Sequence, residues 1–434
     1  MRILLCGALT TCLWSAGCEK SVRDERVKPL SIAPGGHSSA DPDGGRADSG
    51  GLSDAGTPGW QDPAEDEPEL PPQKFSKRAL LAAAASCALN RMEAFRAHAL
   101  TLRTETKAFA QDPTSVRRSA AQQAFLAAYA SFQQVELFRF GPVARMMDDP
   151  AGKDVRDRIY AFPQANPCMV DQRIVDKKYT SAFTSLLIGA RGLSALEYLL
   201  FNSGSQNACA DAVGINKSGG WVALGASGMK QRRADYAAAA AKDVVAQMDG
   251  LLAAWSSDGG GFADALRNGG GEVYDGEQAA LNAVSHGLFY LEKEIKDLKL
   301  GLPLGLVEGC VTAPCLERVE SPYAKVSTDN LRQNLIGFRR LFEGCGKNGT
   351  GLGFDEWLRE VGASDLANDM VRSLADAQAS LDTLDPALEQ TLASNVDKAL
   401  AVHAAVKKLN DLLKTDFVTT LNLDLPMGAV GDND

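Results

Sequence analysis

Apolar residues recur along much of this chain at the three- and four-residue spacing of helices that bury one face. In the first such stretch, residues 76–110, Leu80, Cys87 and Phe95 form much of the apolar face, and Ser76 can cap its start. No part of the chain shows the sustained alternation of apolar and polar residues that is typical of strands. The pattern therefore predicts an all-α protein.

Breaks in this pattern separate further helices. Glycine- and asparagine-rich loops are expected at residues 202–227 and 259–271. The stretch 177–201 is apolar on several sides, which is typical of the central helix in a bundle. The other predicted helices span residues 115–140, 228–256, 275–298, 322–344, 353–382 and 385–416.

The first residues of the chain predict export. Arg2 is followed by a mostly apolar run to Trp14 and then by small residues at 15–17, which is the layout of a signal peptide. Small residues directly before Cys18 favour a lipoprotein signal peptide at residues 1–17, with lipid on Cys18. The alternative is an ordinary secreted protein in which this cysteine carries no lipid. No later stretch has the roughly 18 apolar residues that a membrane helix needs.

Residues 18–75 are predicted to form a disordered, acidic tether. They are rich in Gly, Ser, Asp, Pro and Glu and poor in aromatic residues, so they cannot bury enough surface to offset the loss of chain entropy. Residues 19–74 hold twelve acidic and six basic side chains, a net charge of −6 out of the chain's formal −10. The rest of the chain has no basic stripe, which argues against a nucleic-acid partner.

Six cysteines remain after the signal and Cys18, and an even number in an exported chain favours disulfides. Six cysteines allow 15 pairings, so the sequence alone leaves the pairing open. The pairs we favour are Cys310 with Cys315, Cys168 with Cys209, and Cys87 with Cys345. A short proline-containing loop joins the first pair, the second flanks the 177–201 helix, and the third is what remains. A metal–thiolate site is the alternative, although no C-x-x-C spacing supports it.

The stretch 191–201, RGLSALEYLLF, carries a polar pair within an apolar helix. Ser194 and Glu197 stand three residues apart, so they project from one helical face. Burying a carboxylate is costly unless another group pairs with it. Glu197 is therefore expected to have a counter-ion, a hydrogen-bond donor or a metal ion beside it, and Arg139 and Arg173 are possible donors.

This stretch resembles the signature of the imelysin family, in which Gly-x-His-x-x-Glu marks the proposed metal site. Gly192, Ser194 and Glu197 occupy the corresponding positions, with serine in place of the histidine. Three further segments resemble the family in order and spacing, and together the segments cover most of residues 76–420. They are 132–143, 297–305 and 320–344.

The resemblance implies an imelysin-like fold of two packed helical bundles. It also implies a role in iron acquisition, as a component that binds iron or a partner protein of an uptake system. The expected organisation is a signal peptide at 1–17, the tether at 18–75, an N-terminal bundle at 76–215, a C-terminal bundle at 216–420 and a frayed tail at 421–434.

The resemblance further implies a metal site, whose ligands differ here. Imidazole is a strong ligand for iron or zinc and a serine hydroxyl is a poor one, so Ser194 leaves a hard oxygen site for iron or another divalent metal. Glu136, which matches a glutamate of the family pattern, and Glu320 are further candidate ligands beside Glu197. Glu136 and Glu197 could hold a cation or share a proton. The alternative for Glu136 is an exposed helix residue.

Other polar residues have simpler expected roles. Ser321 precedes Pro322, which suits the capped start of a helix. His286 shares a helical face with Tyr290, and a hydrogen-bonded core histidine is favoured over metal ligation. Asp171 lies where family members contribute polar residues.

The sequence offers little for catalysis. A zinc hydrolase normally needs three protein ligands and an activated water, but His-Glu-x-x-His is absent and the four histidines are scattered. No Gly-x-Ser-x-Gly elbow, P-loop or dinucleotide fingerprint occurs. We therefore expect a non-enzymatic lipoprotein, anchored by Cys18 on the periplasmic or surface face of the outer membrane. The alternatives are a structural or interaction module and, less favoured, a metallopeptidase.

Overall fold

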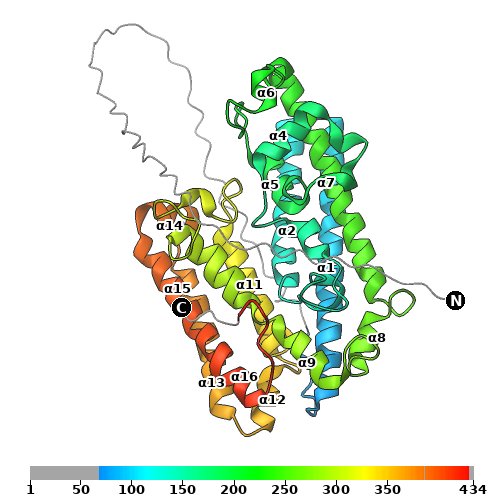
Figure 1. The fold of residues 1–434 in the computed structure, drawn as a ribbon, viewed down its shortest axis with the longest axis vertical. Coiled ribbons are helices and arrows are strands. Elements are labelled where there is room, and N and C mark those ends of the chain that lie inside the picture. Colours follow the sequence, from blue (N-terminus) through cyan, green and yellow to red (C-terminus); the bar gives the residue numbers. More distant parts are fainter. Residues whose placement is uncertain (1–67, 386, 430–434) are drawn as a thin grey trace, which may run out of the picture. The chain divides into compact units, whose positions relative to one another are not determined.

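The structure is a computed structural model that describes residues 68–385 and 387–429. Every regular element in these two ranges is helical, which confirms the all-α prediction. The blue-to-green and the yellow-to-red helices form two groups (Figure 1). The predicted signal peptide, the lipidated Cys18 and most of the tether lie outside the described residues. The predicted division of the bundles at residue 215 stays a prediction.

Long helices build the first group. Its helices are α1 (Lys77–Gln111), α2 (Ser115–Val135), α3 (Val155–Tyr160), α4 (Pro167–Asp176), α5 (Gly192–Phe201), α6 (Gly214–Lys217), α7 (Gly225–Trp255), α8 (Phe262–Arg267) and α9 (Gly276–His286). Both α1 and α5 pack against α2 and α7. Ser76 caps α1 as predicted, because its hydroxyl accepts a hydrogen bond from the amide of Ala79 at 3.1 Å.

The second group begins with a π-helix and is joined to the first through α11. Its helices are the π-helix η7 (Leu291–Gly301), α10 (Leu302–Leu304), α11 (Ser327–Phe342), α12 (Phe354–Glu360), α13 (Ser364–Asp382), α14 (Leu388–Ser394), α15 (Val396–Leu412), the π-helix η10 (Leu413–Phe417) and α16 (Val418–Leu421). α15 packs against α13 and η7, and α11 packs against both α13 and α2. None of the helices in the described ranges is both long and apolar enough to cross a membrane.

Short 3-10 turns connect these helices. They are η2 (Gly141–Val143), η3 (Lys178–Thr180), η4 (Phe183–Ser185), η5 (Ile188–Ala190), η6 (Val222–Leu224), η8 (Leu316–Arg318) and η9 (Lys347–Gly349).

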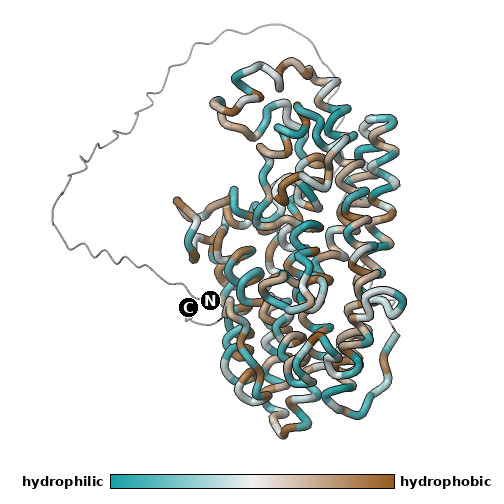
Figure 2. The backbone as a smooth tube through the Cα atoms, turned by 45° about the vertical axis from the view of Figure 1, so that its right-hand side comes forward, coloured by the Kyte–Doolittle hydropathy of each residue, from teal (hydrophilic) through white to brown (hydrophobic). Residues whose placement is uncertain are grey.

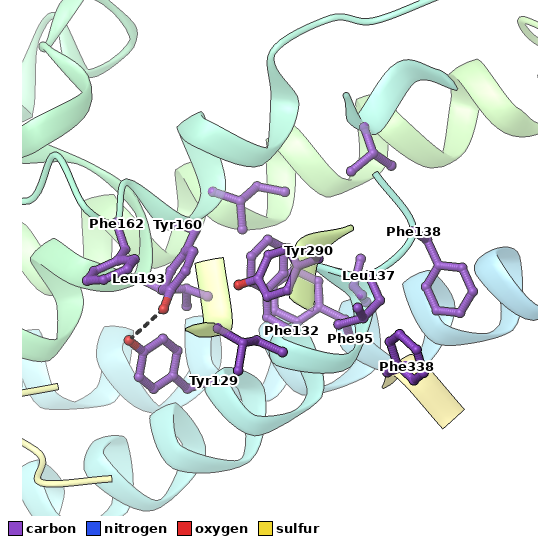
Figure 3. Packing of buried hydrophobic residues seen from close by; sticks show 14 of the residues in the cluster. Phe95, Tyr129, Phe132, Leu137, Phe138, Tyr160, Phe162, Leu193, Tyr290 and Phe338 are labelled. Carbon is purple, nitrogen blue, oxygen red and sulfur yellow. Dashed lines mark hydrogen bonds between the residues drawn. The ribbon is translucent and has the colours of Figure 1, made fainter. Parts of the chain in front are cut away.

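Aromatic side chains fill the core of the first group. The rings of Phe95 and Phe132 lie 4.9 Å apart, and the Tyr129 hydroxyl donates to that of Tyr160 at 3.4 Å (Figure 3). Tilted aromatic pairs of this kind add to the free energy of apolar burial. Figure 2 shows apolar positions recurring between polar ones along the helices, as expected where each helix buries one side.

The predicted helix at 177–201 is shorter than expected, because α5 begins only at Gly192 and the preceding residues form 3-10 turns. Gly192 has a φ of +66°, which a side-chain-bearing residue rarely adopts. A Cβ atom at this position would lie 2.3 Å from the carbonyl oxygen of Ile159. The apolar pattern extends through the turns because they are partly buried, not because they are helical.

All three favoured cysteine pairs are present as disulfides, namely Cys87–Cys345, Cys168–Cys209 and Cys310–Cys315. The first ties α1 to the loop after α11, across 258 positions of sequence. The second ties α4 to the loop after α5.

Both ends of the described chain are more ordered than the sequence predicts. Near the start, the amide of Leu70 donates to the Thr350 hydroxyl at 3.0 Å, so the last residues of the predicted tether lie against the folded part. Near the end, Leu423 and Ala429 are buried. Leu423 and Ala429 thus pack on the folded part, whereas Met427 between them is 90% exposed, so the segment up to residue 429 is packed in part.

We predict that Gly192→Ala lowers the free energy of unfolding by at least about 2 kcal/mol, because the new methyl group meets a backbone carbonyl at a left-handed position. Chemical denaturation measures the change. Gly250→Ala is the matched control, since Gly250 is an exposed glycine inside α7 whose added Cβ would meet nothing within 4 Å. The control should be neutral or stabilising by up to about 1 kcal/mol. Equal effects of the two changes would contradict the prediction.

Candidate functional site

A cavity of about 170 Å³ lies beside α5, where both helix groups contribute side chains. Ser194, Glu197 and Tyr198 line it from α5. Glu320 and Tyr323 line it from the segment that precedes α11. The structure thus brings together three of the residues singled out from the sequence, Ser194, Glu197 and Glu320.

Glu197 is buried, with only 2% of its surface exposed, and one of its oxygens is fully occupied. Oε1 accepts hydrogen bonds from the Ser321 hydroxyl at 2.9 Å and from the amides of Tyr323 and Ala324 at 3.0 and 2.9 Å. The turn at 321–324 therefore folds around this oxygen. Oε2 of Glu197 makes no hydrogen bond with any described residue.

Burial raises the pKa of Glu197 to about 7, although the donors from Ala324, Ser321 and Tyr323 oppose the shift. None of the described arginines donates a hydrogen bond to Glu197. Arg139 pairs instead with Glu294. An arginine partner for Glu197, one of the possibilities raised by the sequence, is therefore wrong. The carboxyl group of Glu197 is therefore held by neutral donors alone.

Arg173, the other arginine considered, also pairs elsewhere, with Asp176 at 2.7 Å. Arg191, at the start of α5, pairs with Asp243 of α7 at 2.8 Å. The first pair lies within α4, and the second ties the start of α5 to α7. Neither arginine is therefore available to Glu197.

Ser194 lies on the same face of α5 as Glu197, as the spacing predicts. Its hydroxyl donates to the carbonyl oxygen of Tyr160 at 2.6 Å. This bond fixes the start of α5 against the end of α3. The hydroxyl proton of Ser194 is therefore used in this hydrogen bond, and the hydroxyl oxygen can act toward other groups only as an acceptor.

Glu320 is buried and bonded to the first helix group. Its Oε1 accepts from the amide of Gln133 at 2.9 Å and lies 3.1 Å from the ammonium of Lys299. Its Oε2 is buried and accepts no well-aligned hydrogen bond from the described residues, although the side chain of Asn330 acts on the carboxyl group as a donor. Burial, followed by the negative charge of Glu136, raises the pKa of Glu320 well above its usual range.

Lys299 is a buried residue of the π-helix η7, and three polar side chains surround its ammonium group. Besides Glu320, its ammonium donates to the side-chain oxygens of Gln133 and Asn334, each at 2.7 Å. Burial lowers the pKa of Lys299 to about 7, against the raising effect of Glu136. Burial thus moves both members of the Lys299–Glu320 pair toward their neutral forms.

Glu136 is fully buried, so the alternative of an exposed helix residue is wrong. Arg156 binds both of its oxygens, at 2.7 and 3.2 Å, and the Tyr290 hydroxyl donates to Oε2. Glu136 does not line the cavity beside Glu197. Its charge acts on Glu320 instead, within one buried polar network.

The remaining candidates serve the fold. Asp171 accepts from the Tyr198 hydroxyl at 2.8 Å and from the amide of Ala208 at 2.7 Å. The ring of His286 lies 3.1 Å from the carbonyl oxygen of Asp424, as expected of a hydrogen-bonded histidine. Ser321 binds Glu197 rather than capping a helix, because α11 begins only at Ser327.

Arg156 and Lys299, which hold buried carboxylates, are not among the residues predicted from the sequence. Arg156 lies in the charged run 153–158, where nothing separates it from exposed basic residues. Lys299 stands between Leu298 and Leu300, in the segment 297–305 noted for its resemblance alone. A basic residue inside an apolar helical stretch is a usable signal for a buried ion pair.

The comparisons with known proteins agree with the fold. A family model described as Imelysin matches residues 88–415, which is more than half of the chain. A solved structure of a "putative iron-regulated protein A precursor" from Parabacteroides distasonis is 14% identical, with a TM-score of 0.58, and covers 81% of this chain and 99% of that one. An imelysin-like protein from Psychrobacter arcticum is 13% identical, with a TM-score of 0.59 and coverages of 82% and 99%. At these identities the similarity shows the fold alone. None of the curated proteins matches.

We predict that Glu136→Gln lowers the free energy of unfolding by about 3 kcal/mol, because it leaves the charge of Arg156 buried with a weaker partner. Asp369→Asn is the matched control, since it removes one member of an exposed pair with Arg372 and should have no measurable effect. Urea denaturation at pH 7 compares the two. A change in Glu136→Gln as small as that of the control would contradict the importance of the buried pair.

The raised pKa of Glu197 predicts a pH dependence of stability. The pKa of Glu197 is about 7 in the folded protein against 4.5 for an ordinary glutamate, so the folded state binds more protons between these values and loses stability as pH rises through them. Glu197→Gln cannot titrate, so between pH 5 and pH 8 it should lose about 2 to 3 kcal/mol less than the unmodified protein. Glu93→Gln, at an exposed glutamate of α1, is the control. Parallel stability curves for the Glu197 variant and the unmodified protein would sink the prediction.

Proposed function

Because the chain belongs to the imelysin family, we propose that it serves iron uptake as a non-enzymatic protein of the cell envelope. The Parabacteroides protein with the same fold is named as iron-regulated, which supports a role of this chain in iron uptake. The export signal and Cys18 support a lipid-anchored protein on the periplasmic or surface face of the outer membrane. The partner we propose is an envelope protein of the uptake system.

The residues at the cavity do not fit an iron site built on an imidazole. Ser194 offers a hydroxyl whose proton is bound to a backbone carbonyl, and a hydroxyl is a poor ligand for iron. No group of three His, Cys, Asp or Glu side chains within residues 68–385 and 387–429 is placed to hold a metal ion. The hydrogen bonds to Glu197 all end on Oε1, and Oε2 of Glu320 accepts no well-aligned hydrogen bond from the described residues. Carboxylate oxygens of this kind suit a hard cation held weakly.

One observation carries the proposal: Glu197 is a buried carboxylate with an unbonded oxygen, and its bonded oxygen is held by neutral donors only. Such a group favours either a proton or a cation. A cation in the cavity would replace the proton, so its affinity depends on pH. We infer that the cavity beside Glu197 is a weak cation position, and that tight capture of iron falls to the uptake system rather than to this chain alone.

A second candidate function is a structural or interaction module without metal. It rests on the three donors at Oε1 of Glu197, which come from the turn at 321–324 and join it to α5. In that role Glu197 holds the two helix groups in register, and the protein presents a helical surface to another envelope protein.

A metallopeptidase is the least supported function. It requires a metal with three protein ligands and a bound water, and the cavity offers carboxylate oxygens without an imidazole. Cleavage of casein that chelators abolish would establish it.

We predict that ferrous and zinc ions bind the purified protein weakly, and about tenfold more weakly at pH 6 than at pH 8, because a group with a pKa near 7 is mostly protonated at the lower pH. Calorimetric titration, under argon for ferrous ion, measures both affinities. Glu197→Gln should abolish the pH dependence and weaken binding at pH 8.

Glu93→Gln is the control for the loss of one carboxylate, since Glu93 is exposed on α1. Binding no tighter than millimolar at pH 8, or affinity equal in the Glu197 and Glu93 variants, would remove the metal role and leave the interaction module.

A further inference from the structure

A second cavity, of about 290 Å³, lies at the C-terminal end of α5. It is bounded by the first residues of α2 and α7 and by the loop after α5. Three cationic side chains line it, Arg118 from α2 and Lys230 and Arg233 from α7. None of the described residues that line it is acidic. The cavity is therefore positively charged.

Arg233 is the deepest of these cations, with 8% of its surface exposed. Its Nη1 donates to the carbonyl oxygens of Asn202 and Gly204 at 3.1 and 2.9 Å. Its Nε and Nη2 are buried and have no hydrogen-bond partner among the described residues. The guanidinium carbon lies 5.8 Å from the centre of the Trp221 ring, which accepts none of these N–H groups as a hydrogen bond. A buried guanidinium with two unsatisfied nitrogens, which carry three N–H bonds, is costly, and an anion is the usual partner that satisfies them.

Arg118 adds a second guanidinium to the same cavity. Its Nε donates to the carbonyl oxygen of Leu200 at 2.7 Å. Burial and then the positive charge of Arg233 lower the pKa of Arg118 below its usual value, so the two guanidinium groups repel each other. The charge of Arg233 also acts on Asp171, whose Oδ2 is held by Tyr198 and Ala208 and whose Oδ1 is buried without a hydrogen bond. Asp171 forms no hydrogen bond with Arg233 and does not line the cavity, so it does not satisfy the free nitrogens of Arg233.

The cavity also has an apolar side. Phe109, Leu199 and Met229 line it opposite the polar groups, and the hydroxyls of Thr114 and Ser115 lie at its α2 end. A ligand of this size with one charged end and one apolar end would match both sides.

We propose that this cavity binds a small organic oxyanion, whose carboxylate or phosphate group accepts hydrogen bonds from Arg233 and Arg118 while its carbon skeleton packs on Phe109, Leu199 and Met229. Guanidinium groups suit this chemistry because they present paired donors to the two oxygens of such a group. Lys230 is exposed and lies at the opening, where it adds charge. The site is separate from the cavity beside Glu197 and does not rest on the function proposed for it.

The competing explanation is that the arginines only cap α5. Cations are favourable at a helix C-terminus, and both arginines do bind carbonyl oxygens there. Capping accounts for one nitrogen of each arginine. Capping leaves Nε and Nη2 of Arg233 without a hydrogen-bond partner. It also does not explain why the described lining of the cavity holds no acidic side chain to balance the cations.

Calorimetric titration of the purified protein with inorganic phosphate, butyrate and succinate tests the proposal. We expect saturable binding of at least one of them, weakened at high ionic strength because the attraction is electrostatic. Phosphate alone, or the carboxylates alone, would identify which oxyanion the site prefers. The variants are Arg233→Gln, which should weaken binding at least about tenfold, and Lys230→Gln, which removes an exposed charge without disturbing the core.

Lys242→Gln is the matched control, since Lys242 is an exposed lysine of α7 outside the cavity. If Arg233→Gln does not fold, a weaker affinity in Lys230→Gln than in Lys242→Gln still supports the site. No binding tighter than about 10 mM by any of the three anions, or an equal loss in both lysine variants, would overturn it. Zinc affinity at pH 8 should be unchanged in all three variants, so this outcome is independent of the metal titration.

Discussion

The burial of carboxylates where the two helix groups meet is the constraint on which the rest of this structure depends. Glu197 of the first group is held by donors from the turn at 321–324. Glu320 of that segment is held in turn by Gln133 of the first group. Because Glu197 and Glu320 each accept hydrogen bonds across the junction, the two groups are expected to lose their arrangement together if the junction opens.

Lys299 and Arg156 complete this junction with charge. Lys299 reaches Gln133, Asn334 and Glu320 from the π-helix η7, and Arg156 reaches Glu136 from α3. Burial lowers the pKa of Lys299 and raises that of Glu320, whereas Arg156 holds both oxygens of Glu136 in a bidentate ion pair. The cavity beside Glu197 therefore lies next to a buried network in which burial weakens the charges of one ion pair and two hydrogen bonds hold the other.

Much of the fold could be predicted from the sequence, but the partners of its polar residues could not. Helical spacing predicts most of the helices. The loop positions of the cysteines favour two of the three disulfides, and Cys87–Cys345 follows only as the remaining pair. The sequence also predicts that Glu197 is buried and has a donor. It does not predict the donor, because two of the three are backbone amides, which every residue except proline carries. The start of α5 was misplaced for a related reason: apolar periodicity does not report the left-handed backbone at Gly192.

The two cavities share one short helix, and their opposite charges follow from how that helix is enclosed. α5 is about 15 Å long, from ten residues at 1.5 Å each. On the face that meets the second group it presents a carboxylate, and the neutral donors of the turn occupy only one of its oxygens. At its C-terminal end it presents carbonyl oxygens, and the arginines that bind them use only part of their donors. In both places the segment that encloses α5 forms some of the possible hydrogen bonds and leaves others unmade. The unmade bonds belong to a carboxylate in the first cavity, beside Glu197, and to a guanidinium in the second, beside Arg233. A fold that needs these groups for its own stability thereby also positions them for ligands of opposite charge.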